Sequence, residues 1–176
     1  GGGTSINMNC NEVIANRALE IMGRSKGEYE FCHPNNHVNR SQSTNDVYPT
    51  AFRLALFWAL GGLMEHMAYL QAGFEDKAQE YADVLKMGRT QLQDAVPMTV
   101  GQQFGAYATT VGEDICRVEE ARGLVLEINL GATAIGTGVH SHPDYAPLVV
   151  RPLAEIPRPP PVPSPNLLEA PRDTGA

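Results

Sequence analysis

Apolar residues recur at three- and four-residue steps along two long stretches of the chain, the spacing that places them on one face of an α-helix. The first stretch covers residues 49–81 and the second covers residues 99–129. Pro49 suits the first turn of a helix, where its missing N–H costs nothing. Gly61 and Gly62 fall in the middle of the first stretch, so we expect either close packing or a bend there.

Shorter segments flank the two long helices. A helix is expected in residues 4–22, with Thr4 or Ser5 as its N-cap and Gly23 as its stop. The other expected segments are a polar loop with at most one helical turn at 24–46, a short extended connection at 83–98, a glycine-rich loop at 131–138 and a proline-rich tail at 151–176.

Two helices this long do not bury their apolar faces within a chain of this size. Long amphipathic helices need partners, so we expect an extended bundle that is completed by sequence outside this chain or by other subunits. The predicted fold class is therefore all-α in the main, a long-helix bundle with short extended connections and an irregular tail. Residues 1–150 are assigned to a central helical domain. The tail, residues 151–176, holds eight of the 13 prolines and is interpreted as truncated.

Composition limits the possible functions. The 176 residues carry 13 Lys plus Arg against 20 Asp plus Glu, for a net charge of −7, and no basic cluster is present. Nucleic-acid binding is therefore not expected. The longest uncharged apolar run, residues 54–64, is too short to span a bilayer, so no membrane association is expected either. Three widely spaced cysteines are typical of reduced thiols in a cytoplasmic protein.

Familiar cofactor and metal motifs are incomplete. Residues 131–136 have the glycine spacing of a phosphate-binding loop, but Thr137 and Gly138 stand where Lys and Ser or Thr are required. Two groups lack the ligand spacing of a zinc site: His140 with His142, and Cys32 with His33 and His37. We therefore expect neither a phosphate-binding loop nor a metal site.

Neutral hydrogen-bonding residues gather in three clusters, at residues 4–12, 33–46 and 88–94. Their amides and hydroxyls can hold a small polyanion. Ser43, Thr44 and Asn45 also stand at an expected helix start, where free N–H groups favour a carboxylate. The alternative interpretation is that Ser43 and Asp46 only cap that helix and that the asparagines serve turns.

In these clusters the chain resembles the aspartase/fumarase superfamily. The matching strings are TSINMNCNE at 4–12, HPN through STND at 33–46, GRTQLQDAVP at 88–97 and NLGATAIGTG at 129–138. The resemblance implies a mainly helical fold whose long central helices assemble four subunits into one bundle. It also implies elimination of ammonia or water from a succinate-type substrate to give fumarate, without a metal or organic cofactor. A base removes a proton, and converging donors stabilise the resulting aci-carboxylate.

The resemblance also assigns roles to individual residues. Those implied to contact the substrate carboxylates are Thr4, Ser43, Thr44, Asn45 and Thr90, and Gln91 is implied to lie beside the leaving group. Fumarase-type members carry His at the position of Gln91, and His relays protons to a leaving hydroxide. Gln cannot titrate, whereas an ammonium group leaves already protonated. An aspartase-type reaction, from L-aspartate to fumarate, is therefore favoured.

Two departures from the family pattern affect the interpretation. The family's Ser-rich loop, which supplies the catalytic serine base and a lysine, is not in this sequence, and neither is the family's N-terminal domain. We therefore expect an internal fragment that carries two of the three active-site regions and is inactive alone. His33, Asn35 and Asn36 match a secondary anion site of fumarases, but Asn36 replaces the usual Asp.

Two other functions remain open. One is a fumarase that interconverts malate and fumarate, which residues 141–146 resemble more closely. The other is a non-catalytic helical oligomerisation module, for which the proline-rich tail is the support. A short natural protein would begin at Met and stop after Ala176, whereas a fragment would not.

Overall fold

The computed structural model describes residues 3–156 and 160–172, and the chain divides into two compact units. Unit 1 comprises residues 1–56 and 124–176, and unit 2 comprises residues 57–123. The elements, in chain order, are α1 (Thr4–Ile21), the π-helical turn η1 (Pro34–Val38), α2 (Thr44–Glu80), β1 (Leu85–Thr90), β2 (Gln93–Thr99), α3 (Val100–Leu124), β3 (Glu127–Ile128), α4 (Tyr145–Leu153) and β4 (Val162–Pro163). The predicted mainly helical fold is confirmed.

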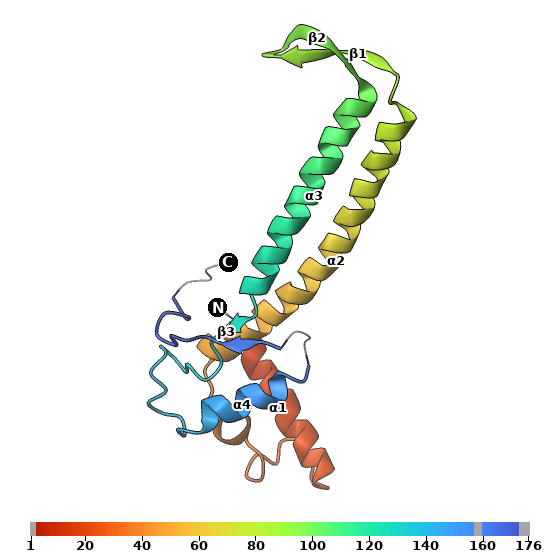
Figure 1. The fold of residues 1–176 in the computed structure, drawn as a ribbon. Coiled ribbons are helices and arrows are strands. Elements are labelled where there is room, and N and C mark those ends of the chain that lie inside the picture. Colours follow the sequence, from red (N-terminus) through yellow and green to blue (C-terminus); the bar gives the residue numbers. More distant parts are fainter. Residues whose placement is uncertain (1–2, 157–159, 173–176) are drawn as a thin grey trace. The chain divides into compact units, whose positions relative to one another are not determined.

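Within unit 2, the C-terminal part of α2 runs antiparallel to α3 (Figure 1). At one end of this pair, Phe74 of α2 and Tyr81, the residue directly after α2, contact the ring of Phe104 on α3, with ring centroids 6.0 and 6.1 Å apart. At the other end, Arg122 of α3 donates to the Phe57 carbonyl at 3.1 Å and lies over the Phe57 ring. Because a Cβ on Gly61 would stand 3.3 Å from the Arg122 guanidinium, close packing explains that glycine.

The start of α3 is fixed by a reciprocal cap. The Thr99 N–H donates to Gln102 Oε1, and the Gln102 N–H donates to Thr99 Oγ1, both at 3.0 Å. Gly101, the second residue of α3, lies so close to α2 that a Cβ there would stand 2.5 Å from the Ala78 carbonyl oxygen. The backbone of α3 therefore begins against the last turns of α2.

A β-hairpin connects α2 to α3 along the chain, where the sequence predicted only an extended connection. Strands β1 and β2 pair antiparallel, with Thr90 opposite Gln93. Gln91 and Leu92 form the two-residue turn, with φ of 49° and 64°. Positive φ at both central positions is the turn that matches the twist of a hairpin, but the usual Asn-Gly signal is missing, which is why the sequence did not reveal it.

Helix α2 begins at Thr44, so the prediction that Pro49 occupies the first turn was wrong. Pro49 lies inside the helix and offers no N–H to the Asn45 carbonyl four residues earlier. The Asn129 side chain takes over that role, because its Nδ2 donates to the Asn45 carbonyl at 2.9 Å. A residue distant in the sequence thus allows the helix to start before its proline.

The predicted end of α3 at Asn129 was also wrong, because the helix stops at Leu124. Residues 125–130 instead form an extended, largely buried segment that contains β3. Ile128 of β3 packs with Leu130 and with Val150 of α4 in the core of unit 1. The proline-rich tail contributes β4, which pairs parallel with β3 through Val162 N–H to Leu126 O and Ser164 N–H to Ile128 O, both 2.9 Å.

Helix α1 matches its predicted span, but neither Thr4 nor Ser5 is its N-cap. Gly3 occupies that position, and its carbonyl accepts the Asn7 N–H at 3.0 Å. The helix stops before Gly23, as predicted, and Gly23 has a φ of 71°.

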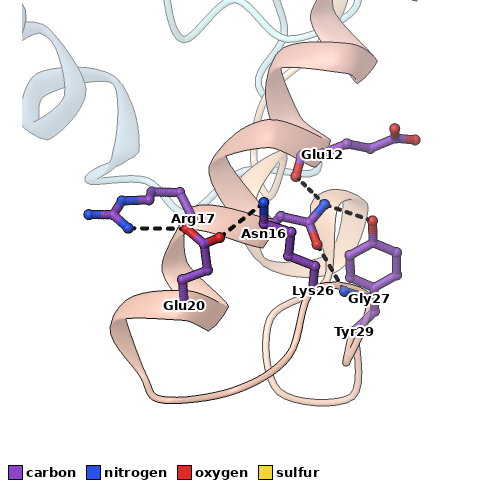
Figure 2. A network of polar contacts seen from close by, with 7 residues as sticks. All are labelled: Glu12, Asn16, Arg17, Glu20, Lys26, Gly27 and Tyr29. Atoms are coloured by element: carbon purple, nitrogen blue, oxygen red, sulfur yellow. Dashed lines mark hydrogen bonds and ion pairs between the residues drawn. The ribbon is translucent and has the colours of Figure 1, made fainter.

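Asn16 ties the loop after α1 back to the helix (Figure 2). Its Nδ2 donates to the Glu12 carbonyl at 2.9 Å and to the Tyr29 hydroxyl at 3.1 Å, while its Oδ1 accepts the Gly27 N–H at 2.9 Å. On the same face, Glu20 pairs with Lys26 and Arg17, and these two cations lower the pKa of Glu20.

Replacement of Asn16 by Ala is therefore expected to loosen this loop. The variant loses the bonds to Gly27 and Tyr29, which should lower the free energy of unfolding by about 1 kcal/mol. Trypsin should then cleave faster after Arg24 and Lys26, measured as the appearance of the two fragments over time. Asn9→Ala, an exposed change on the same helix, is the control, and equal cleavage rates in both variants would contradict the assigned role.

Candidate active site

Two asparagines of α1 reach the start of α2. Asn7 and Asn11 are four residues apart, on one face of the helix, and are only 6% and 3% exposed. Asn7 Nδ2 donates to Thr44 Oγ1 at 3.1 Å and to Asn39 Oδ1 at 3.3 Å, and Asn11 Nδ2 donates to the same Asn39 oxygen at 3.0 Å. Thr44 therefore acts as an acceptor in this network, and its hydroxyl proton is left to donate to a ligand.

The first turn of α2 is closed by its own side chains. Ser43 Oγ accepts the Asn45 N–H at 3.1 Å, and Asp46 Oδ1 accepts the Ser43 N–H at 3.0 Å. Ser43 and Asp46 thus cap the helix, as one interpretation of the sequence predicted. Asp46 is completely buried, and this burial raises its pKa against the opposing effect of the backbone N–H groups that it accepts.

The glycine-rich loop contacts the same turn. Asp46 Oδ2 accepts the Thr133 N–H at 2.8 Å, and Asn45 Nδ2 donates to the Ala134 carbonyl at 2.8 Å. Thr133 has a φ of 60°, which is uncommon for a β-branched residue. The loop is therefore held in a specific conformation against the helix start.

Thr44 and Asn45 line a pocket of about 470 Å³ within unit 1. Its other lining residues are Pro49, Ala134, Ile135, Leu168, Pro171 and Arg172. The lining thus includes residues that carry a hydroxyl, an amide and a guanidinium, in a mostly apolar pocket at a helix start. Such a set of donors suits a carboxylate.

The remaining predicted substrate contacts lie elsewhere on the chain. Thr4 is exposed at the first residue of α1, in unit 1. Thr90 ends β1 and Gln91 lies in the hairpin turn, both exposed and both in unit 2. Of the six predicted substrate contacts, the pocket brings together Thr44 and Asn45, with Ser43 directly before them.

The residues predicted as a secondary anion site have a structural role around η1. His33 Nδ1 accepts the N–H groups of Asn35 and Asn36 at 3.0 and 3.3 Å, so it caps this turn. The His33 N–H in turn donates to His37 Nδ1 at 2.8 Å. In residues 3–156 and 160–172, no three His, Cys, Asp or Glu side chains gather as a metal site, and Cys10, Cys32 and Cys116 are free thiols.

A family model described as "Lyase" matches residues 1–176. The chain belongs to the Lyase family. This match, together with the relatives and solved structures described next, confirms the resemblance to the aspartase/fumarase superfamily that the sequence motifs indicated.

Curated relatives of this Lyase-family chain are named aspartate ammonia-lyase. The Helicobacter pylori (strain ATCC 700392 / 26695) protein is 58% identical over all 176 residues, and the Escherichia coli (strain K12) protein is 54% identical over the same length. The chain spans 38% and 37% of the lengths of these two relatives.

Solved structures show the same fold. A Brucella melitensis structure described as "fumarate lyase:delta crystallin", bound to cobalt, matches 99% of this chain with a TM-score of 0.93 and 53% identity, over 38% of its own length. A class II fumarase from Schistosoma mansoni matches 88% of this chain with a TM-score of 0.76 and 33% identity, over 33% of its own length.

Sequence reasoning did not single out several residues that shape the pocket of this Lyase-family chain. Asn39, Asn129 and Thr133 act through partners between 28 and 87 positions away, and no local pattern reveals such pairs. Asn7 and Asn11 did carry a signal, because two amides at helical spacing on a buried face need partners.

Proposed function

We propose that this chain supplies substrate-carboxylate contacts to an aspartate ammonia-lyase, which eliminates ammonia from L-aspartate to give fumarate. The observation that carries the proposal is the pocket at the start of α2, where Thr44 and Asn45 present donors. Relatives named aspartate ammonia-lyase at 54–58% identity over the chain support the choice of reaction.

In this proposal the donors act on charge that develops during the reaction. Removal of a proton beside a carboxylate converts it to an aci-carboxylate with a second negative charge. The Thr44 hydroxyl then stabilises this charge more strongly than that of the ground state. Gln91 lies beside the ammonium that leaves and transfers no proton. The general base, a serine by resemblance, is not among the residues of this sequence.

The proposed assembly is a homotetramer in the cytoplasm. Large apolar side chains of α2 in unit 2 are exposed, among them Trp58 at 51%, Tyr69 at 84% and Leu70 at 48%, and partner subunits would cover them. By length and composition α2 also qualifies as a candidate membrane span. Its aromatic contacts with α3, and the match to solved lyase and fumarase structures, favour a bundle helix instead.

The test offers L-aspartate and L-malate separately to the full-length gene product. Fumarate formation, followed by its ultraviolet absorbance, is expected from aspartate together with one ammonia per fumarate. Light scattering on the same sample is expected to give four copies per particle.

The second candidate function is a fumarase, which the 33% identity to the Schistosoma mansoni class II fumarase favours. Turnover of malate alone would establish it and would contradict the argument from Gln91. A folded tetramer that turns over neither substrate would instead support a non-catalytic module.

A further inference from the structure

The carboxylate of Asp46 connects two parts of unit 1 that are far apart in the sequence. Its Oδ1 accepts the Ser43 N–H at 3.0 Å, and its Oδ2 accepts the Thr133 N–H at 2.8 Å, from a residue 87 positions away. Its side chain is fully buried, with 0% exposure. An ordinary helix cap at the surface needs only the first of these bonds.

Both bonds lie next to residues that line the pocket. Thr44 and Asn45 stand between Ser43 and Asp46, and Ala134 follows Thr133. The Asn45 side chain adds a second bond between the helix start and the loop, because its Nδ2 donates to the Ala134 carbonyl at 2.8 Å. The orientation of Thr44 and Asn45 and the position of the opposite loop are thus set by one carboxylate.

The backbone of the loop also needs this contact. Thr133 has a φ of 60°, a left-handed conformation that costs a β-branched residue free energy. The bond from its N–H to Asp46 holds it there. Loss of that bond is expected to let the loop relax and to move the Ala134 carbonyl away from Asn45.

We propose that Asp46 is a positioning residue for substrate binding. It holds the Thr44–Asn45 turn and the glycine-rich loop in a fixed position relative to each other beside the pocket. This inference rests on the proposed function, because it acts through the contacts assigned there to the substrate carboxylate. It adds a role for a buried acid that touches no substrate itself.

Asp46→Asn in the full-length gene product is the test. The amide has the same shape, but only one of its two polar atoms accepts, so its NH₂ group must face the N–H of Ser43 or of Thr133. KM for aspartate is expected to rise at least 10-fold, with a smaller fall in kcat. The matched control is Glu28→Gln, because Glu28 Oε2 likewise accepts the N–H of the residue three positions earlier, Ser25, at 2.9 Å, in a remote loop. This control should leave both constants unchanged.

A double-mutant cycle with Thr44→Val separates positioning from general destabilisation. If Asp46 acts through Thr44, the double variant should lose no more than the worse single variant. If instead Asp46→Asn lowers only the unfolding temperature and leaves KM unchanged, or if the two losses multiply, the proposal is overturned.

The pH dependence gives a readout that a purely structural role would not move. Burial raises the pKa of Asp46, and no charged side chain in the described residues contributes to that shift; Tyr145 is the titratable group that faces it from α4. Its charged form is lost on acidification earlier than that of an ordinary aspartate. KM should therefore rise as the pH falls through this raised pKa, in wild type and in Glu28→Gln but not in Asp46→Asn.

Hydrogen exchange of the Ser43 and Thr133 amides keeps this inference distinct from the proposed function. Faster exchange at both amides in Asp46→Asn, but not in Glu28→Gln, is expected whether or not the wild type turns over aspartate. Normal exchange protection of both amides in Asp46→Asn would refute the positioning role of Asp46. Faster exchange in Asp46→Asn, in a protein whose wild type has no lyase activity, would refute the proposed function alone.

Discussion

Thr44→Val is expected to lower kcat/KM for aspartate about 100-fold in the full-length gene product, the loss typical of removing one donor to a developing oxyanion. Valine keeps the shape of threonine but has no hydroxyl, so the carboxylate loses the donor that Asn7 holds in place. The measurement is steady-state fumarate formation at several aspartate concentrations. The loss should appear in both constants, because the hydroxyl contacts the carboxylate in the ground state, which sets KM, and its second charge in the transition state, which sets kcat.

Thr44→Ser is the matched control for this prediction. Serine retains the hydroxyl and the acceptor for Asn7, so its kcat/KM should stay within a few-fold of wild type. Thermal unfolding of both variants should begin near the wild-type temperature, because Asn7 still donates to Asn39 in each of them. A fully active Thr44→Val variant would show that Thr44 is not a substrate contact.

Gly101→Ala is expected to destabilise unit 2 by a net of about 2 kcal/mol, since overpacking costs about 3 kcal/mol and the better helix propensity of alanine returns about 1. The new Cβ would stand 2.5 Å from the Ala78 carbonyl oxygen and 2.7 Å from the Ala82 Cα, and neither backbone atom can rotate away. For a chain of this size the loss corresponds to a fall of roughly 4–8 °C in the unfolding temperature, measured by calorimetry.

Gly73→Ala provides the opposite case within the same unit. A Cβ at Gly73, inside the C-terminal part of α2, meets nothing within 4 Å. Helix propensity then acts alone, and a gain of about 1 kcal/mol is expected. Shifts of the same sign in the two variants would show that α3 does not begin against α2 as described.

Local patterns predicted the long helices well, since apolar spacing reports directly on an amphipathic face. They failed where a distant residue decides the outcome. The start of α2 was placed at Pro49 because the sequence around it does not reveal that Asn129 satisfies the Asn45 carbonyl. The end of α3 was placed too late because residues 125–130 are apolar enough for a helix, whereas Glu127 and Ile128 within them pair with the tail as β3.

The candidate site was predicted in the same uneven way. Ser43, Thr44 and Asn45 were identified by motif and by their position at a helix start. The structure places Thr44 and Asn45 in the lining of the pocket and Ser43 directly before them. The binding roles of Thr90 and Gln91 stay predictions, and so does the secondary anion site at His33, Asn35 and Asn36. The support from Asn39, Asn129 and Thr133 depends on the fold and is invisible to local patterns.

The turn of the hairpin has an evolutionary consequence. Gln91 and Leu92 both adopt positive φ, a conformation that costs an ordinary residue about 1–2 kcal/mol and that Asn and Gly tolerate far better. Under the role proposed for Gln91, selection on chemistry at position 91 therefore works against selection on stability. In a lineage released from catalysis, these two positions should be among the first to drift, and they should drift toward Asn-Gly.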